Sequence, residues 1–511
     1  MESKSFNALN RRQFIRQAAC AAVGTTALTA AIRDLRFMNA AVAQTNISDY
    51  KALVCIFLGG GNDSNNLIIP TIASEYNNYA AIRKASLAIP QANILNLDNL
   101  NGNNYGPLNS DGHTYGLHPS CPELRTLFGA GKLAILLNAG TLAYPMTKAQ
   151  YNKNVSQRPP QLFSHADQVA QWQTSVPDQA PVTGWGGRCA DLLQAVQTNA
   201  PVSLSVTLGG ANTFEVGNIV SQYSVSTSGA INLQGVSGAR LTALTNILGL
   251  QYPNMQVQAY ADVAEHAINT GTLLNSAIST TADPSASQQF WTVPFPGRTP
   301  FQVTNPNSLV KFDSRDLGPQ LKMIARLIEA GHRAAGGPGG FGMKRQIFFC
   351  QVGGYDLHSG QTDQPGGGSA VNGAHSNLFA ELSQCMNAFQ AAISQIGTMH
   401  GDPSFAQRVT AFTASDFGRT FPANSAGSSD HGWGSHHLIM GGAVQGRKTY
   451  GKFPVLTVDG PDDTNTGRWI PTTACDQYFA TLASWFGVDS SNLGTVFPNL
   501  GRFSTPNLGF I

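Results

Sequence analysis

The chain has 511 residues, of which 31 are Lys or Arg and 29 are Asp or Glu, giving a formal net charge of +2. Charged residues make up only 12%, half of the roughly 25% typical of soluble globular proteins, which excludes a charged disordered tail and a coiled coil. The basic surplus is only two residues and there is no run of Lys and Arg, so no nucleic-acid partner is expected.

The N-terminus has the features of an export signal. Arg11 and Arg12 form a twin-arginine pair, an apolar stretch of small residues covers 18–32, and residues 41–43 form an A-x-A cleavage site. We expect residues 1–43 to be a signal peptide that is recognised by the twin-arginine export machinery and cleaved, leaving the rest of the chain in the periplasm or the medium. The alternative is an amphipathic first helix of the folded domain. No segment reaches the ~18 uninterrupted apolar residues of a membrane span.

Four apolar runs of strand length divide the chain after the signal. They are almost continuously apolar, as in parallel strands buried on both faces, and cover 51–58, 133–137, 346–352 and 408–413. Helical periodicity at 321–334 and 377–396 precedes the last two runs, and this alternation predicts right-handed βαβ units. The predicted fold is α/β, with a largely parallel central sheet sandwiched between helices.

A polar segment from about 200 to 310 interrupts this pattern. It is rich in Ser, Thr, Asn and Gln, contains a predicted helix near 257–275, and is interpreted as an insertion or cap. The six cysteines after the signal are far apart with no C-x-x-C pair, so a cysteine-based zinc site is not predicted. Cys55 and Cys350 lie in predicted strands and should be buried, whereas the spacing leaves disulfide pairing undetermined.

Acidic and histidine residues follow three of the predicted strands. Asp63 follows the first, Asp356 and His358 follow another, and Asp416 follows a third, with Arg419 three residues later. Ligands of open α/β sheets bind at the carboxyl ends of strands, so these side chains are expected to converge. The glycine run at 59–61 does not match G-x-G-x-x-G, and a nucleotide site is not indicated.

The segment 430–437, DHGWGSHH, adds Asp430, His431 and His437 to this set. Asp and His are ligands of divalent metals, and the identity of the metal stays open among Zn, Mn, Mg and Ca. Two neighbouring ions would suit the hydrolysis of phosphate or sulfate esters. Each of these residues also has a structural interpretation, as a helix cap, an ion-pair partner such as Arg419 for Asp416, or a packing histidine.

A nucleophile is harder to identify. The absence of G-x-S-x-G argues against an ordinary α/β-hydrolase. Ser164, which precedes His165, is a candidate that a metal would activate in place of a general base. Ser64, next to Asp63, is more readily interpreted as a surface hydroxyl.

These motifs resemble the DUF1501 family of exported bacterial proteins, which is similar in fold to the alkaline phosphatase and sulfatase superfamily. The resemblance covers nearly the whole chain after the signal and rests on segments in matching order: 57–63, 117–119, 163–165, 184–185, 353–358, 415–420 and 430–434. It implies that residues 44–511 form an alkaline phosphatase-like α/β domain with a metal site at the carboxyl edge of its sheet.

The superfamily resemblance also implies two ions with separate ligand sets. The first set would be Asp63, Ser164 and Asp416. The second would be Asp356, His358 and His431, with His436 or His437 nearby. Phe417 stands where the superfamily has a histidine, which leaves the first set one imidazole short.

Two hypotheses follow. The first is an exported metal-dependent hydrolase acting on a phosphate or sulfate ester of a small molecule or polysaccharide. In it, metal-activated Ser164 or water attacks in line, Arg419 stabilises the non-bridging oxygens and His165 protonates the leaving group. The alternative is a catalytically silent exported binding or assembly protein on the same fold, motivated by Phe417 and by the lack of a convincing nucleophile.

Overall fold

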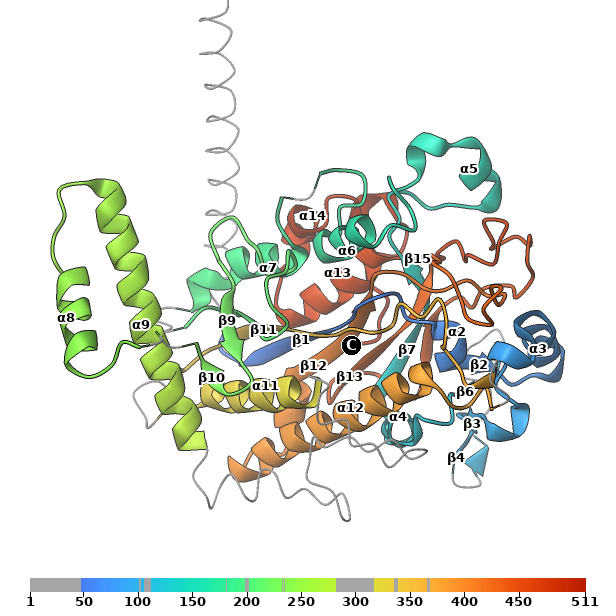
Figure 1. The fold of residues 1–511 in the computed structure, drawn as a ribbon, viewed down its shortest axis with the longest axis horizontal. Helices are drawn as coiled ribbons and strands as arrows, with labels where there is room; N and C mark the ends of the chain where they lie inside the picture. Colours follow the sequence, from blue (N-terminus) through green and yellow to red (C-terminus); the bar gives the residue numbers. More distant parts are fainter. Residues whose placement is uncertain are drawn as a thin grey trace, which may run out of the picture.

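A central sheet runs through the computed structural model (Figure 1). The structure describes residues 47–100, 103–104, 112–180, 182–197, 202–231, 233, 235–281, 317–334, 339–364 and 368–511. The strands of the sheet are β1 (Lys51–Leu58), β7 (Leu133–Gly140), β8 (Ser205–Thr207), β9 (Tyr223–Ser226), β10 (Gly229–Ala230), β11 (Arg345–Val352), β12 (Val409–Ser415), β13 (Ser435–Gly441), β14 (Thr449–Gly451) and β15 (Thr473–Ala474).

The order of the strands confirms a largely parallel sheet. Neighbours follow one another as β10-β9-β8-β11-β1-β12-β13-β7-β14, and β15 also pairs with β7. The pairs made by β10 and β13 are antiparallel, and the other pairs in this sheet are parallel. Strands β7, β11 and β12 correspond to predicted apolar runs, whereas β13 was not predicted as a strand.

The central strand β1 shows why its sequence is apolar throughout. It lies between β11 and β12, with Cys55 opposite Phe349 on one side and Phe412 on the other. Successive side chains of a strand point to opposite faces, so a strand covered on both faces has no polar side. Accordingly, Val54 belongs to the core on one face of the sheet and Leu53 to the core on the other.

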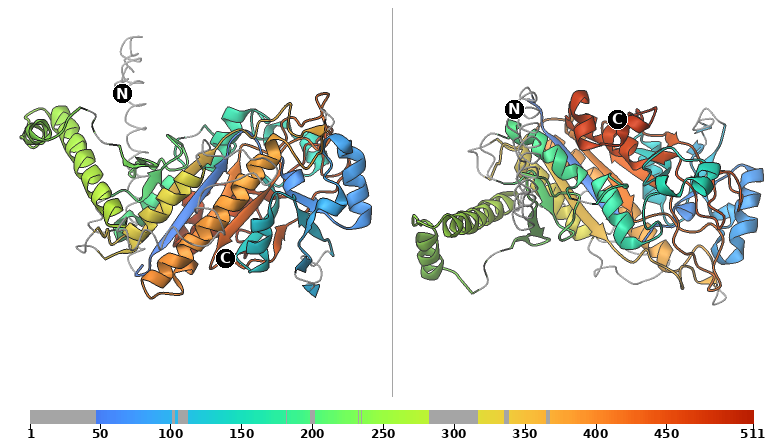
Figure 2. Two further views of the ribbon diagram at one scale, coloured as in Figure 1. Left: turned by 60° about the horizontal axis from the view of Figure 1, so that its bottom comes forward. Right: turned by 90° about the horizontal axis from the view of Figure 1, so that it is seen from above.

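Helices cover both faces of the sheet, as predicted (Figures 1 and 2). One layer contains α4 (Pro122–Gly129), α11 (Leu317–His332) and α12 (Ala374–Met399), whose apolar residues share a core with Val54. The other layer contains α6 (His165–Thr174), α7 (Trp185–Leu193) and α13 (Cys475–Phe486), which share a core with Leu53. The predicted helices at 321–334 and 377–396 are α11 and α12.

Smaller elements surround this sandwich. A second sheet has the order β2-β6-β3 and a hairpin pairs β4 with β5. The bounds are β2 (Ile68–Pro70), β3 (Leu95–Asn96), β4 (Asn99–Leu100), β5 (Asn103–Asn104), β6 (Tyr115–Leu117), α2 (Ser64–Leu67), α3 (Ala73–Leu87), α5 (Lys148–Lys153) and α14 (Leu493–Val496).

The polar segment near 200–310 is divided between the sheet and an arm. Its first strands, β8 and β9, extend the central sheet. The helix α8 (Ala239–Leu248) and the first part of α9 (Met255–Thr281) then stand away from the sheet, whereas the C-terminal part of α9 packs against β10 and α11 (Figures 1 and 2). The predicted helix at 257–275 lies within α9. The rest of the segment, from 282, lies outside the described residues.

Three other expectations concern the ends and the cysteines. The proposed signal peptide at 1–43 lies outside the described residues. Within the part of the chain that the structure describes, no helix is long and apolar enough to cross a membrane. The six described cysteines are all free and buried, which includes Cys55 and Cys350 in β1 and β11.

Candidate metal centre

Loops at the carboxyl edge of the sheet bring four chemically active side chains together. Asp356 and His358 follow β11, His165 is the first residue of α6, and His431 lies between β12 and β13. Because β1, β11 and β12 are parallel neighbours, the loops that follow them meet at one edge. We call His165, Asp356, His358 and His431 the His–Asp cluster. Their side chains are between 24% and 46% exposed.

The Nε2 atom of His431 lies close to all three other members. It is 3.1 Å from Nε2 of His165, 2.9 Å from Nε2 of His358 and 3.4 Å from Oδ1 of Asp356. The Asp356 carboxylate in turn lies 3.4 Å from His165 Nε2 and 3.1 Å from His358 Nε2. His358 makes no contact with His165 within hydrogen-bond distance, so these two flank the His431–Asp356 pair.

Each histidine of the cluster is held by its other ring nitrogen. The pairs are His165 Nδ1 with Asp416 Oδ2 at 2.7 Å, His358 Nδ1 with Asp430 Oδ1 at 2.8 Å, and His431 Nδ1 with the Phe163 carbonyl oxygen at 2.8 Å. Ionised carboxylates and carbonyl oxygens only accept hydrogen bonds, so each Nδ1 carries a proton. In a neutral imidazole, each Nε2 then presents a lone pair to the centre of the cluster.

Lone pairs that face one another can share a proton or a metal ion. The nitrogen–nitrogen contacts at 2.9 and 3.1 Å have the length of hydrogen bonds, yet two neutral rings whose protons both lie on Nδ1 have no donor between them. A proton is a poor occupant at His431, because partial burial, aided by the nearby charges of His165 and Arg419, lowers the pKa of this imidazole. The donor set of His165, Asp356 and His431 could hold a metal ion.

The spacing of the donors fits a transition metal. Zinc–nitrogen bonds of about 2.0–2.1 Å place tetrahedral ligands roughly 3.3 Å apart. The contacts among His165, Asp356 and His431 are 3.1, 3.4 and 3.4 Å, and their ligand atoms all lie within 4.8 Å of one another. Nδ1 atoms fixed by carboxylates or carbonyls are typical of metal-binding histidines. An imidazole-rich set suits Zn or another transition metal better than Mg or Ca.

The support of Asp356 comes from Arg419. The Arg419 side chain is only 1% exposed, and its Nη1 donates to Asp356 Oδ1 at 2.7 Å and to the Gly60 carbonyl at 3.2 Å, while Nη2 donates to the Ser429 carbonyl. Burial raises and Arg419 lowers the pKa of Asp356, and the net pKa lies below its usual value. The expectation that Arg419 meets substrate oxygens or pairs with Asp416 is corrected, because its guanidinium is buried against Asp356.

Asp416 and Asp430 are each hydrogen-bonded to the Nδ1 atom of a histidine of the cluster. Oδ2 of Asp416 contacts His165, and its Oδ1 accepts from the Gly60 backbone N–H at 3.0 Å. Asp430 Oδ1 contacts His358 and also accepts from the Asn424 side chain at 3.0 Å. Both were predicted as metal ligands. The structure makes them carboxylates that orient the imidazoles, because their oxygens are bonded to the Nδ1 sides of the rings.

Glycines in the loop after β1 let these groups approach closely. Gly60 and Gly61 have φ angles of +114° and +85°, which side chains rarely tolerate. A Cβ at Gly60 would lie 2.4 Å from the Asp356 backbone nitrogen, and one at Gly61 would lie 2.4 Å from the Phe417 ring. The glycine run thus allows the loops that follow β1, β11 and β12 to pack closely against one another.

Comparison with known protein families places this geometry in context. The profile of the family described as "Protein of unknown function (DUF1501)" matches residues 50–466. The chain belongs to the DUF1501 family. A search of curated proteins found no match. In this DUF1501 chain the matched range contains the whole His–Asp cluster together with the two carboxylates behind it.

Asp63, predicted as a metal ligand, is held in a buried ion pair instead. Its carboxylate pairs with the Arg83 guanidinium and accepts from Gln361 Nε2 at 2.5 Å and Asn65 Nδ2 at 3.2 Å. Burial raises and Arg83 lowers the pKa of Asp63, and the net pKa lies below its usual value. The Asp63 carboxylate is therefore bonded to Arg83, Gln361 and Asn65 and makes no contact with the His–Asp cluster.

Ser164 and His437 are also away from the cluster. The Ser164 hydroxyl donates to Asp167 Oδ2 at 2.6 Å, in the first turn of α6. His437 is 1% exposed, and its ring lies 4.7 Å from the Trp172 ring centroid and 5.9 Å from that of Tyr478. The reason is that residues 435–441 form the buried strand β13 rather than a loop, and alternate side chains enter the core.

Two supporting residues were not predicted as part of the site. Phe163 has a φ of +73°, rare for a residue with a side chain, and its carbonyl bonds to His431. Arg468 donates from Nε to the His431 carbonyl at 2.8 Å, and its guanidinium lies 4.2 Å from the centroid of the Phe163 ring. Its Nη groups have no partner among the described residues. Phe163 lies in the 163–165 motif, two residues before His165, whereas no motif contains Arg468.

Proposed function

We propose that this DUF1501 chain is an exported metal-dependent hydrolase of phosphate or sulfate esters. The observation that carries the proposal is the convergence of unprotonated imidazole nitrogens on Asp356, with each Nδ1 fixed from behind. The partial exposure of the cluster supports access by a substrate. Export through the twin-arginine route rests on the sequence motif.

His165, Asp356 and His431 would hold the ion. When bound, the ion supplies Lewis-acid polarisation of an ester oxygen and activates water as a nucleophile. Arg419 keeps Asp356 ionised, and Asp416 keeps the proton of His165 on Nδ1. These contacts prepare the donor atoms before binding, as surrounding groups of metal sites commonly do.

His358 is the best placed general acid and base. It is the most exposed member of the cluster, and its Nε2 faces Asp356 and His431 without touching His165. Asp430 fixes the Nδ1 proton, which leaves Nε2 free to accept a proton from water and return it to the leaving group. We therefore assign to His358 the proton transfer that the sequence suggested for His165.

Arg468 supports an anionic ester as the substrate. Its Nε is fixed on His431 and its ring contact holds the guanidinium plane, while both Nη groups are free of other described residues. A planar guanidinium matches two oxygens of a phosphate or sulfate group. Arg468 would thus take the role that buried Arg419 cannot perform.

Several observations favour one ion and a water nucleophile over the two-ion arrangement of the alkaline phosphatase superfamily. Asp63 is committed to Arg83, and Ser164 is bonded to Asp167. The Phe417 ring packs 4.8 Å from the His165 ring and 4.7 Å from the His431 ring, measured between centroids. Membership of that superfamily is proposed on the largely parallel sheet and on the position of the cluster at its carboxyl edge.

The test combines metal content with turnover. The mature protein is purified without chelator and assayed on aryl phosphate and aryl sulfate mono- and diesters. The control variant is His266→Gln, which replaces an exposed residue of α9. We expect His431→Gln to lose metal and turnover, and His358→Gln to keep metal but lose at least 100-fold in turnover. The control should keep both.

Two results would contradict the proposal. Turnover that persists in metal-depleted protein would remove the metal from the mechanism. Stoichiometric metal without turnover on any ester of the panel would favour the alternative, a catalytically silent binding or assembly protein.

A further inference from the structure

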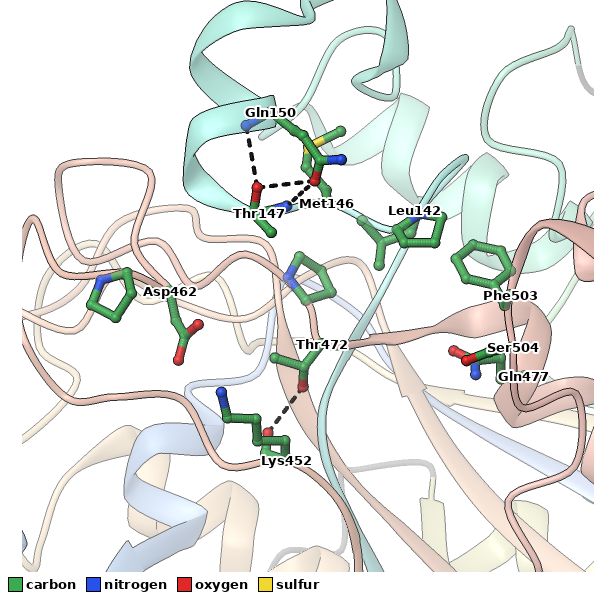
Figure 3. A pocket seen from close by; sticks show the side chains of 13 residues that line it. Leu142, Met146, Thr147, Gln150, Lys452, Asp462, Thr472, Gln477, Phe503 and Ser504 are labelled. Atoms are coloured by element: carbon green, nitrogen blue, oxygen red, sulfur yellow. Dashed lines mark hydrogen bonds between the residues drawn. The ribbon is translucent and has the colours of Figure 1, made fainter.

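A second hollow lies at the same edge of the sheet and is not part of the His–Asp cluster (Figure 3). Its volume is about 440 Å³, which suits a small ligand. Leu142 and Met146 come from the segment after β7, Lys452 follows β14, and Phe503 comes from the C-terminal segment. We call this hollow the β7 pocket.

The β7 pocket is linked to the metal centre by packed side chains. In the sheet, β7 is separated from β12 by β13 alone, so the two strands are roughly 10 Å apart. Leu142 and Phe503 share a small core with Trp433, and Met146 and Phe163 pack against it. Phe163 is the residue whose carbonyl holds His431. The two sites are therefore neighbours along one edge.

Two opposite charges line the β7 pocket without pairing. Lys452 and Asp462 both contribute to its wall, and no ion pair joins them (Figure 3). The ammonium of Lys452 has no hydrogen-bond partner among the described residues. Asp462 accepts from the Val455 backbone N–H through Oδ2 at 2.9 Å, and its Oδ1 has no described partner. A ligand in this pocket thus meets a donor and an acceptor whose charges cancel.

Several other polar groups of the pocket are hydrogen-bonded within the protein. The amide oxygen of Gln150 accepts from the Thr147 backbone and hydroxyl, and the Thr472 hydroxyl donates to the Lys452 carbonyl (Figure 3). Gln477 is bonded to backbone groups through both ends of its amide. What remains for a ligand is Lys452, Asp462, the Gln150 amide nitrogen, the Ser504 hydroxyl and the apolar wall.

The chemistry of these remaining groups matches a sugar. A hydroxyl both donates and accepts, so neighbouring hydroxyls can accept from Lys452 and donate to Asp462. The zero net charge of the pair disfavours a purely anionic or cationic ligand. The C–H face of a pyranose ring would suit the apolar wall of Leu142, Met146 and Phe503.

We propose that the β7 pocket binds a neutral sugar residue through Lys452 and Asp462. Resting on the proposed function, this makes the substrate a sulfated or phosphorylated glycan. Its ester group would lie at the His–Asp cluster and an adjoining sugar unit in the β7 pocket.

The test measures sugar binding separately from turnover. Neutral hexose and N-acetylhexosamine oligosaccharides of two to four units are titrated into the purified protein by calorimetry and saturation-transfer NMR. We expect binding by at least one of them, weakened at least 10-fold by Lys452→Met and by Asp462→Asn. His266→Gln should leave it unchanged, as should His431→Gln, which removes only the metal centre.

The result that overturns this inference is the absence of binding by every saccharide, or binding that neither pocket variant weakens. Binding of free glycine, leucine or lysine in place of the saccharides would also overturn it, since a zwitterion could use both charges. Sugar binding in a protein with no ester turnover would remove the proposed function alone. Turnover without sugar binding would remove the β7 pocket assignment alone.

Discussion

Replacing His437 with leucine should uncouple part of the protein's stability from pH. His437 lies in the core between Trp172 and Tyr478, and burial, followed by the charge of neighbouring His436, lowers its pKa to about 3. The substitution His437→Leu replaces the imidazole with an apolar side chain of similar size. If His437 belongs to the core, the variant should also keep its metal.

The magnitude follows from the proton balance. An unfolded histidine has a pKa of about 6.5, so below that pH the unfolded state binds a proton that the folded core refuses. The folded pKa is depressed, so this group lowers the free energy of unfolding as pH falls from about 7 toward its folded pKa. Between pH 7 and 5.5 the wild type should lose about 1.2 kcal/mol relative to His437→Leu.

Urea denaturation followed by circular dichroism at pH 7.0 and 5.5 measures this difference. Other titrating groups occur in both proteins and cancel in the comparison. Metal is removed from both samples, because the ligand histidines of the His–Asp cluster also titrate. A difference below about 0.3 kcal/mol would refute a buried, neutral His437, and loss of metal from the variant would refute its separation from the cluster.

Three further substitutions test the roles assigned to Arg83, Asp416 and Ser164. Arg83→Met should destabilise the protein by about 3–5 kcal/mol in urea denaturation, because Asp63 becomes a buried unpaired charge. Adding Asp63→Asn should restore part of this loss of stability. An effect below about 1 kcal/mol would contradict the buried ion pair. Asp416→Asn should weaken metal binding about 10–100-fold in a competition assay, since it holds only the far side of His165, and unchanged affinity would contradict that role. Ser164→Ala should keep turnover within about 10-fold, whereas the loss of a nucleophile would cost orders of magnitude.

The sheet was largely predictable because its strands are buried on both faces. Such strands are almost continuously apolar, and residues 52–58 of β1 and 347–350 of β11 show this in the sequence alone. Strand β13 was not predicted because His436 and His437 make the start of its sequence polar, as in a loop. In the strand, His436 accepts through Nδ1 from the Asn138 backbone N–H at 2.9 Å, which satisfies a polar ring inside the protein.

The position of the His–Asp cluster was predictable, but the contacts of its residues were not. Carboxyl ends of parallel strands pointed to the correct edge, and histidines there suggested metal chemistry. Asp356 and Asp416 occupy similar places in the sequence, yet Asp356 faces the imidazole Nε2 atoms while Asp416 faces an Nδ1 atom. That distinction depends on side-chain direction. Asp63 differs again because Arg83, 20 residues away, reaches it from α3.

The most direct measurement is the metal content of the mature protein, by elemental mass spectrometry after purification without chelator. The account predicts about one equivalent of a transition metal per chain, lost in His431→Gln and retained in His437→Leu. A well-folded wild-type protein with no stoichiometric metal, or equal retention in both variants, would contradict the assignment of the His–Asp cluster as a metal centre.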